Sequence, residues 1–223
     1  MSDSTRPAPF RAVLFDWDGT VADTRPGIFN SIRYAIGKAG IPDRPDEELQ
    51  YFIGPPLYVG FEHVFGVTPE EANDLTDTYR VYYRETGIYE CAVYDGVGDL
   101  LRDLHAAGIR TAVVSSKPKE FLDRLVDHFD LGGSFDAVIG PEMHNHNSNK
   151  TILVNRALKE LGLPPEAVAM VGDRHFDMEG AKAASVSAVG ILFGYGEEAE
   201  LRAAGADYIC PAVKDLRACL LGE

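Results

Sequence analysis

Residues 12–20 read AVLFDWDGT, and this stretch decides how the rest of the sequence is interpreted. The four residues Ala12 to Phe15 are apolar, which is typical of a short buried strand. Asp16 and Asp18 follow at once, and Gly19 favours a turn at this point. The stretch therefore indicates a buried strand that ends in two carboxylates.

Further apolar runs follow the first one and alternate with amphipathic stretches from residue 93 onward. We expect strands at Ala12–Phe15, Thr111–Val114, Ala137–Ile139, Ala167–Val171, Ala188–Leu192 and Asp207–Ile209. Between them, apolar residues recur at helical spacing, as in Leu100, Leu101 and Leu104. Strands that alternate with helices predict an α/β fold with a parallel sheet.

The stretch between the first two expected strands breaks this alternation. It contains helical patterns, such as Ile28, Ile32, Ala35 and Ile36, but no convincing strand. We therefore predict a core domain of residues 1–23 and 93–223, and a helical domain of residues 24–92 inserted into it. Because the insertion follows the first strand, it is expected to cover that strand's end.

The composition narrows the class of protein. A chain of 223 residues that is 45% hydrophobic can bury a full core. Its net charge of −14 repels nucleic acid polymers and anionic membranes. An anionic substrate would therefore need local cations to bind.

Targeting signals and cysteine motifs are missing from the sequence. No stretch is apolar for long enough to cross a membrane, and the N-terminus has no apolar signal core. The three cysteines show no CxxC spacing that would suggest zinc. We expect a soluble cytoplasmic protein, monomeric or homodimeric, with no membrane partner.

Reactive side chains follow several of the apolar runs. In open α/β sheets, ligands bind beyond the carboxyl ends of the strands. Carboxylates gathered there suit Mg²⁺, and without a cation they would repel one another. Besides Asp16 and Asp18, the candidates are Ser115 and Ser116 after the second run, Lys150 at the start of a helix, and Asp173 and Asp177 after the fourth run.

Each of these residues also has an ordinary structural explanation. Asp16 and Asp18 could form a simple turn, Ser115 could cap a helix, and Lys150 could be a solvated surface lysine. Their joint occurrence after strands favours a functional site.

Four segments resemble the motifs of the haloacid dehalogenase superfamily of phosphatases. They are DWDGT at 16–20, VVSS at 113–116, Lys150, and VGDRHFD at 171–177. The likeness covers nearly the whole chain, including GPPL at 54–57 and GYG at 194–196, and is strongest to phosphoglycolate-phosphatase-like members. It implies a Rossmann-like parallel-sheet core with an inserted helical cap.

The resemblance also implies a role for each motif residue. Asp16 is the expected nucleophile, Asp18 the general acid and base, and Ser115 and Lys150 the groups that hold the phosphate. Mg²⁺ is the expected cofactor, with Asp16, Asp18 through its carbonyl, Asp173 and Asp177 at its site. Asp177 is expected to orient a metal-bound water or Lys150. Further substrate or phosphate contacts are expected at Gly19, Ser116, Gly54 and Pro55.

The implied function is hydrolysis of a small phosphorylated metabolite, such as phosphoglycolate, a nucleotide or a sugar phosphate. An acid at position 18 favours phosphate esters over haloacids in this superfamily. The motifs alone leave open a phosphomutase, and a non-catalytic binding or regulatory protein is a further alternative. His144 and His146 suggest either a second metal site or, as we prefer, a polar loop at the rim. Asn147 stands where close relatives often carry an arginine.

Overall fold

The computed structural model describes residues 10–143 and 149–222. His144, His146 and Asn147 lie outside the described residues. The chain forms two compact units, a core unit of Met1–Val21 with Val93–Glu223 and a helical unit of Ala22–Ala92. Within the described ranges, no helix is both long and apolar enough to cross a membrane.

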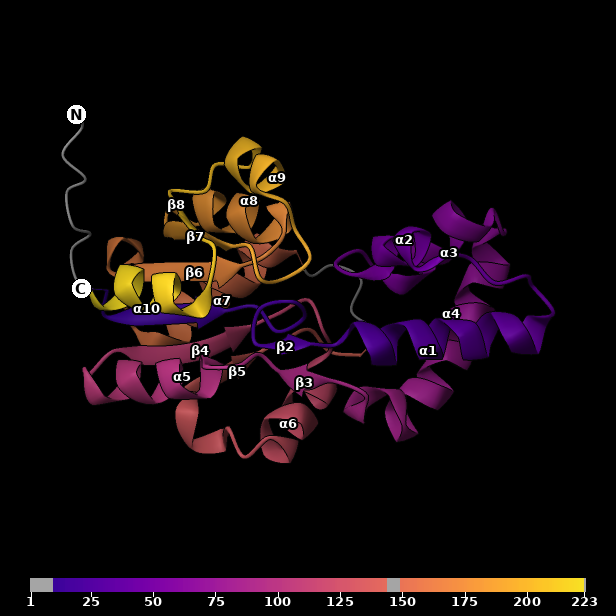
Figure 1. Ribbon diagram of the computed structural model, residues 1–223, viewed down its shortest axis with the longest axis horizontal. Coiled ribbons are helices and arrows are strands. Elements are labelled where there is room, and N and C mark those ends of the chain that lie inside the picture. Colours follow the sequence, from indigo (N-terminus) through magenta and orange to yellow (C-terminus); the bar gives the residue numbers. More distant parts are fainter. Residues whose placement is uncertain (1–9, 144–148, 223) are drawn as a thin grey trace. The chain divides into compact units, whose positions relative to one another are not determined.

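The core unit is built on a parallel sheet of six described strands in the order β5-β4-β1-β6-β7-β8 (Figure 1). The strands are β1 (Ala12–Phe15), β4 (Arg110–Val114), β5 (Ala137–Ile139), β6 (Val168–Gly172), β7 (Ser187–Ile191) and β8 (Tyr208–Cys210). The residues of the three central strands β1, β4 and β6 are almost all buried, as expected for a sheet covered on both faces.

The order of the strands places β1 at the point where the chain changes direction. From β1 the chain continues through β4 to β5 on one side, then crosses back to β6 and proceeds to β8 on the other. Loops that leave neighbouring strands at such a point diverge and leave room for a ligand. The carboxyl ends of β1, β4 and β6 are therefore the expected place for a site.

Helices cover the sheet and complete the core. One face packs Ala12 and Leu14 of β1 against Leu153 and Val154 of α7 and Met178 of α8. On the other face, α5 packs against β4 and against α10. The helices of this unit are α5 (Val97–Ala106), α6 (Lys119–His128), α7 (Lys150–Leu161), α8 (His175–Ala183), α9 (Glu198–Ala203) and α10 (Val213–Leu221).

The helical unit has its own small core. Ile28, Ile32 and Ile36 recur on one face of α1 and are buried, and α1 packs against α4. Helix α4 begins with a capping box between Thr68 and Glu71. The helices are α1 (Arg25–Ala39), α2 (Asp46–Leu49), α3 (Leu57–Phe65) and α4 (Pro69–Glu85).

The predicted fold class is confirmed, with small differences at the ends of elements. Strand β4 begins one residue before the predicted Thr111, and β6 runs from Val168 to Gly172 instead of 167–171. Two short strands were missed, β2 (Ala22–Asp23) and β3 (Ala92–Val93), which pair with each other where the chain enters and leaves the helical unit.

Candidate active site

Three neighbouring strands deliver the candidate residues to one edge of the sheet. Asp16 follows β1, Ser115 follows β4 and Asp173 follows β6. The backbone continues the sheet pairing beyond β1, because Asp16 N–H donates to the carbonyl of Val171 at 3.0 Å. The parallel register therefore fixes where the Asp16 side chain leaves the sheet.

Three carboxylates converge at this edge. One oxygen from each of Asp16, Asp173 and Asp177 lies within 4.8 Å of the others. Asp173 and Asp177 are almost fully buried, at 0% and 1% exposure. The side chain of Asp18 is not a member of this cluster among the described residues.

The cluster carries negative charge that the protein neutralises only in part. Burial, and then the charges of Asp177 and Asp16, raise the pKa of Asp173 well above its usual range. Hydrogen bonds from Tyr195 N–H at 2.8 Å and Thr20 Oγ1 at 3.2 Å act in the opposite direction. Converging buried carboxylate oxygens with this excess charge fit a hard divalent cation such as Mg²⁺.

Lys150, the first residue of α7, is the cation within the cluster. Its Nζ lies 3.0 Å from Asp16 Oδ1 and 2.7 Å from Asp177 Oδ1, and it donates to the carbonyl of Val114 at 3.1 Å. Burial alone would lower the pKa of Lys150, but the carboxylates of Asp16 and Asp177 raise it above its ordinary value. The ammonium therefore stays charged, and the alternative of a solvated surface lysine is wrong.

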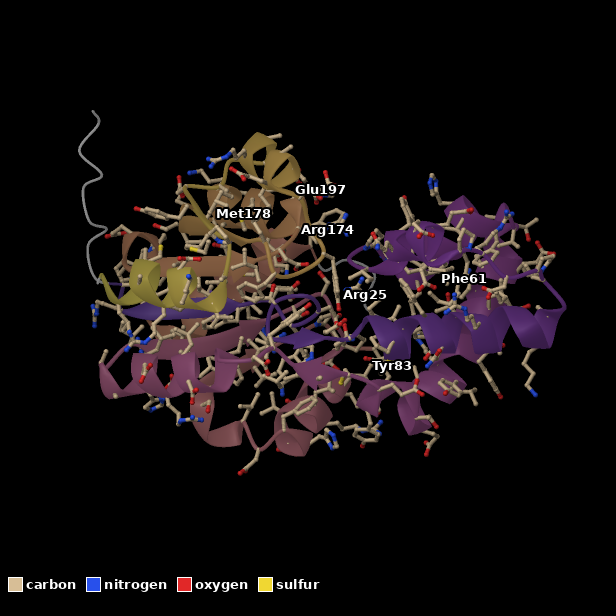
Figure 2. The ribbon with its side chains drawn as sticks, viewed as in Figure 1. Arg25, Phe61, Tyr83, Arg174, Met178 and Glu197 are labelled. Carbon is tan, nitrogen blue, oxygen red and sulfur yellow. The ribbon has the colours of Figure 1, made fainter. Side chains whose placement is uncertain are left out.

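Asp177 is held in place by its own helix as well as by Lys150. Burial and the charge of Asp16 outweigh the attraction of Lys150 and raise the pKa of Asp177 to about 6. Its Oδ2 accepts from Arg174 N–H at 3.1 Å, which fixes the first turn of α8. Figure 2 labels Arg174 and Met178, which mark the start of this helix and its buried side. Asp177 thus links the Lys150 ammonium to the first turn of α8.

A second lysine, which the sequence reasoning did not assign, pairs with Asp18. Lys117 Nζ lies 3.1 Å from Asp18 Oδ2, and the two side chains are 6% and 19% exposed. The hydroxyl of Ser115 accepts from Lys117 N–H at 3.3 Å. Ser116, by contrast, is exposed. The feature of the sequence that could have identified Lys117 is its position two residues beyond Ser115.

Gly19 is required by the close packing around Asp173. Its φ of +79° lies in the left-handed region, and a Cβ there would overlap the carboxylate of Asp173 and contact Tyr195. The absence of a side chain at Gly19 therefore leaves room for the Asp173 carboxylate. Gly54 and Pro55, the other expected contacts, lie in the helical unit, between Phe52 and α3.

The chain belongs to the haloacid dehalogenase-like hydrolases, whose family pattern matches residues 13–191. A 5'-nucleotidase from Pseudomonas aeruginosa is 37% identical over 209 residues, which is 93% of this chain and 94% of that protein. The tyrosine-protein kinase PtkA from Mycobacterium tuberculosis is 34% identical over 184 residues, 82% of this chain but 62% of that protein.

Comparison with solved structures also identifies phosphatases as similar proteins. The crystal structure of a predicted phosphatase from Clostridium acetobutylicum matches with a TM-score of 0.91 and 34% identity over 97% of this chain and 100% of that chain. The family expected from the four motifs is therefore confirmed, as is the prediction of a phosphatase-type hydrolase.

Proposed function

We propose that this protein is a Mg²⁺-dependent phosphatase that hydrolyses a small phosphate monoester through an aspartyl phosphate on Asp16. The observation that carries the proposal is the buried ammonium of Lys150, 3.0 Å from Asp16 Oδ1. A fixed cation beside a carboxylate can hold phosphoryl oxygens while that carboxylate attacks phosphorus.

The reaction would proceed in two displacements. In the first, a carboxylate oxygen of Asp16 forms a bond to phosphorus while the ester P–O bond breaks, and Asp18 gives the leaving alcohol its proton. In the second, a water oxygen forms a bond to phosphorus and gives a proton to Asp18, while the bond between phosphorus and the Asp16 oxygen breaks. Inorganic phosphate leaves and the Asp16 carboxylate is regenerated. The Ser115 hydroxyl, at the end of the neighbouring strand, would donate to a phosphoryl oxygen.

Asp16 and Asp173 are the residues that would hold Mg²⁺, together with the backbone carbonyl of Asp18. The bound ion would neutralise charge on the phosphoryl group and on the carboxylates. Asp177 would act through Lys150, 2.7 Å away, rather than as a direct ligand. The raised pKa of Asp173 supports its assignment as a metal ligand, because a bound cation relieves the repulsion between buried carboxylates.

We propose a 5'-nucleotide as the first substrate class to test. The 5'-nucleotidase from Pseudomonas aeruginosa aligns over almost the full length of both chains, which supports this choice. Residues 24–92 would act as a cap that selects the ester, with Gly54 and Pro55 among the contacts. The core site would recognise the phosphoryl group, which all phosphate monoesters share.

A phosphate-release screen with Mg²⁺ tests the proposal. The panel contains 5'-nucleotides, phosphoglycolate, sugar phosphates and 4-nitrophenyl phosphate, and we expect the highest kcat/KM for a 5'-nucleotide. Acid quenching during turnover should trap phosphate covalently on the wild-type chain. Formation of an isomeric sugar phosphate in place of inorganic phosphate would favour a mutase. No turnover of any ester would favour a binding protein.

A further inference from the structure

Glu200 on α9 contacts the turn between Asp173 and Asp177, although it belongs to none of the four motifs. Its Oε1 accepts from His175 N–H at 2.9 Å and from Arg174 Nε at 2.9 Å, and it lies 2.7 Å from His175 Nδ1. One carboxylate oxygen therefore holds both the backbone and two side chains of this turn. Arg174 is labelled in Figure 2.

The contact between Glu200 and Arg174 also determines where the positive charge of Arg174 lies. Arg174 directly follows Asp173, so its guanidinium is the cation nearest in sequence to a carboxylate of the cluster. The ion pair with Glu200 draws that guanidinium toward α9. If a guanidinium released from Glu200 reached Asp173, it would compete with a metal ion for that carboxylate.

The loop before α9, at residues 194–196, also contacts this turn. Tyr195 N–H donates to Asp173 Oδ2 at 2.8 Å. A Cβ at Gly196 would overlap the carbonyl oxygen of Asp173, and a Cβ at Gly194 would overlap that of Gly19. The GYG sequence at 194–196 thus allows a backbone approach that larger residues would block.

We propose that the segment from Gly194 to Glu200 positions Asp173 for metal binding, and that Glu200 is the positioning residue on which this depends. The inference rests on the proposed Mg²⁺ site. Glu200 is well suited to the role because it stays ionised. Partial burial alone would raise its pKa, but the hydrogen bonds from His175 and Arg174 lower the pKa of Glu200 to about 2.

The test compares Glu200→Gln with Glu198→Gln. Glu198 lies on the same helix, is exposed, and pairs with Arg202 of that helix at 2.7 Å, so it controls for loss of one charge. Mg²⁺ binding to each folded protein is measured by isothermal titration calorimetry, alongside the Mg²⁺ concentration for half-maximal activity. We expect Glu200→Gln to weaken Mg²⁺ binding by about 10–100-fold, as loss of a partner behind a metal ligand typically does. Glu198→Gln should bind like wild type.

Two further variants separate the effect of the Arg174 charge from the effect of the Glu200 side-chain length. If Arg174 competes for Asp173 once it is released, Arg174→Gln combined with Glu200→Gln should recover part of the lost affinity. Glu200→Asp, which keeps the charge, is measured as well and serves if the glutamine variant does not fold. We expect it to bind Mg²⁺ more weakly than wild type because its oxygen is withdrawn from the turn.

Three outcomes are distinguishable. Wild-type Mg²⁺ affinity in both Glu200 variants would overturn the inference, even if their thermal stability fell, because the role would then be structural only. A wild-type protein that binds no Mg²⁺ would overturn the proposed function, and the inference with it. Weakened Mg²⁺ binding with a wild-type KM at saturating Mg²⁺ supports the positioning role.

Discussion

Lys117 Nζ lies 3.1 Å from Oδ2 of Asp18, in a pair whose lysine side chain is only 6% exposed. Among the described residues, the carboxylate cluster consists of Asp16, Asp173 and Asp177 and does not include Asp18. The two aspartates of the DWDGT stretch thus pair with different lysines, Asp16 with Lys150 and Asp18 with Lys117. Such a division suits two different roles for two carboxylates that are two residues apart.

The first prediction concerns Lys117. Lys117→Met should lower kcat/KM by about 10²-fold for an alkyl phosphate, because Asp18 loses the contact that orients it toward the leaving group. The loss should be smaller for 4-nitrophenyl phosphate, whose leaving group departs without a proton. Steady-state kinetics on both esters measure the ratio, with exposed Lys159→Met as the control. An equal loss on both esters would contradict the orienting role.

The second prediction concerns the nucleophile. Asp16→Asn should lower kcat by a factor on the order of 10³ or more, since an amide does not attack phosphorus and ligates Mg²⁺ poorly. The acid-trapped phosphate should disappear as well. Circular dichroism provides the control, because the variant should keep its helix content. Near-normal turnover in Asp16→Asn would remove the covalent mechanism.

The third prediction concerns the metal. Excess chelator should stop turnover, and added Mg²⁺ should restore it. Ca²⁺ should substitute poorly because its larger and looser coordination shell places the carboxylates of Asp16 and Asp173 differently. The measurement is phosphate release after dialysis against chelator, with thermal unfolding as a check that the apoprotein stays folded. Full activity in chelator would refute a metal requirement.

The fourth prediction concerns pH and the stability that Glu200 provides. Its ordinary pKa is 4.5, and in the folded protein the pKa of Glu200 is about 2. A lowered folded-state pKa stabilises the protein above the unfolded value, and this contribution is lost as the pH falls from about 4.5 toward 2. The side chain is 27% exposed, so after allowance for solvent screening we expect about 1–2 kcal/mol.

Urea unfolding of wild type and Glu200→Gln at a series of pH values tests this prediction. The difference in free energy of unfolding should be largest near pH 6–7 and should shrink below about pH 4.5. Glu198→Gln, which removes an exposed charge from the same helix, should show no such trend. A difference that stays constant down to acidic pH would mean that the carboxylate charge of Glu200 is not the cause.

The sequence was sufficient for the fold class because apolar runs and helical spacing report burial directly. It could not fix the ends of strands, because hydrogen bonding to a neighbour decides them. Arg110 belongs to β4 since it pairs in register with Ala12, a relation invisible in its own side chain. Strands β2 and β3 are too short to show any periodicity, so pattern reasoning passed over them.

The same distinction holds for the site. Asp16, Ser115 and Asp173 were predictable because each follows an apolar run, and parallel strands end at one edge. Glu200 gave no signal, because its contact with His175 exists only through the packing of α9 beside α8. Trp17, which lies between Asp16 and Asp18 in the sequence, is fully buried and near Phe129.

The fifth prediction concerns substrate selection by the helical unit. Gly54 has a φ of +116°, and Pro55 and Pro56 lead into α3, which begins at Leu57. Two prolines after such a glycine restrict the backbone, so the turn can present its groups rigidly. If this turn contacts the leaving group, replacing Pro55 and Leu57 with alanine should change the ranking of esters by kcat/KM. The expected shift is about 10–200-fold between esters, as for loss of an apolar contact.

The control for this turn is Pro42→Ala, an exposed proline between α1 and α2 that should leave the ranking unchanged. Mg²⁺ dependence and formation of the aspartyl phosphate should survive in the Pro55 and Leu57 variants, because the core residues that carry them are untouched. A shared loss for every ester would have a different meaning. It would show that the turn supports the folding of the helical unit, and its selective role would then have to be abandoned.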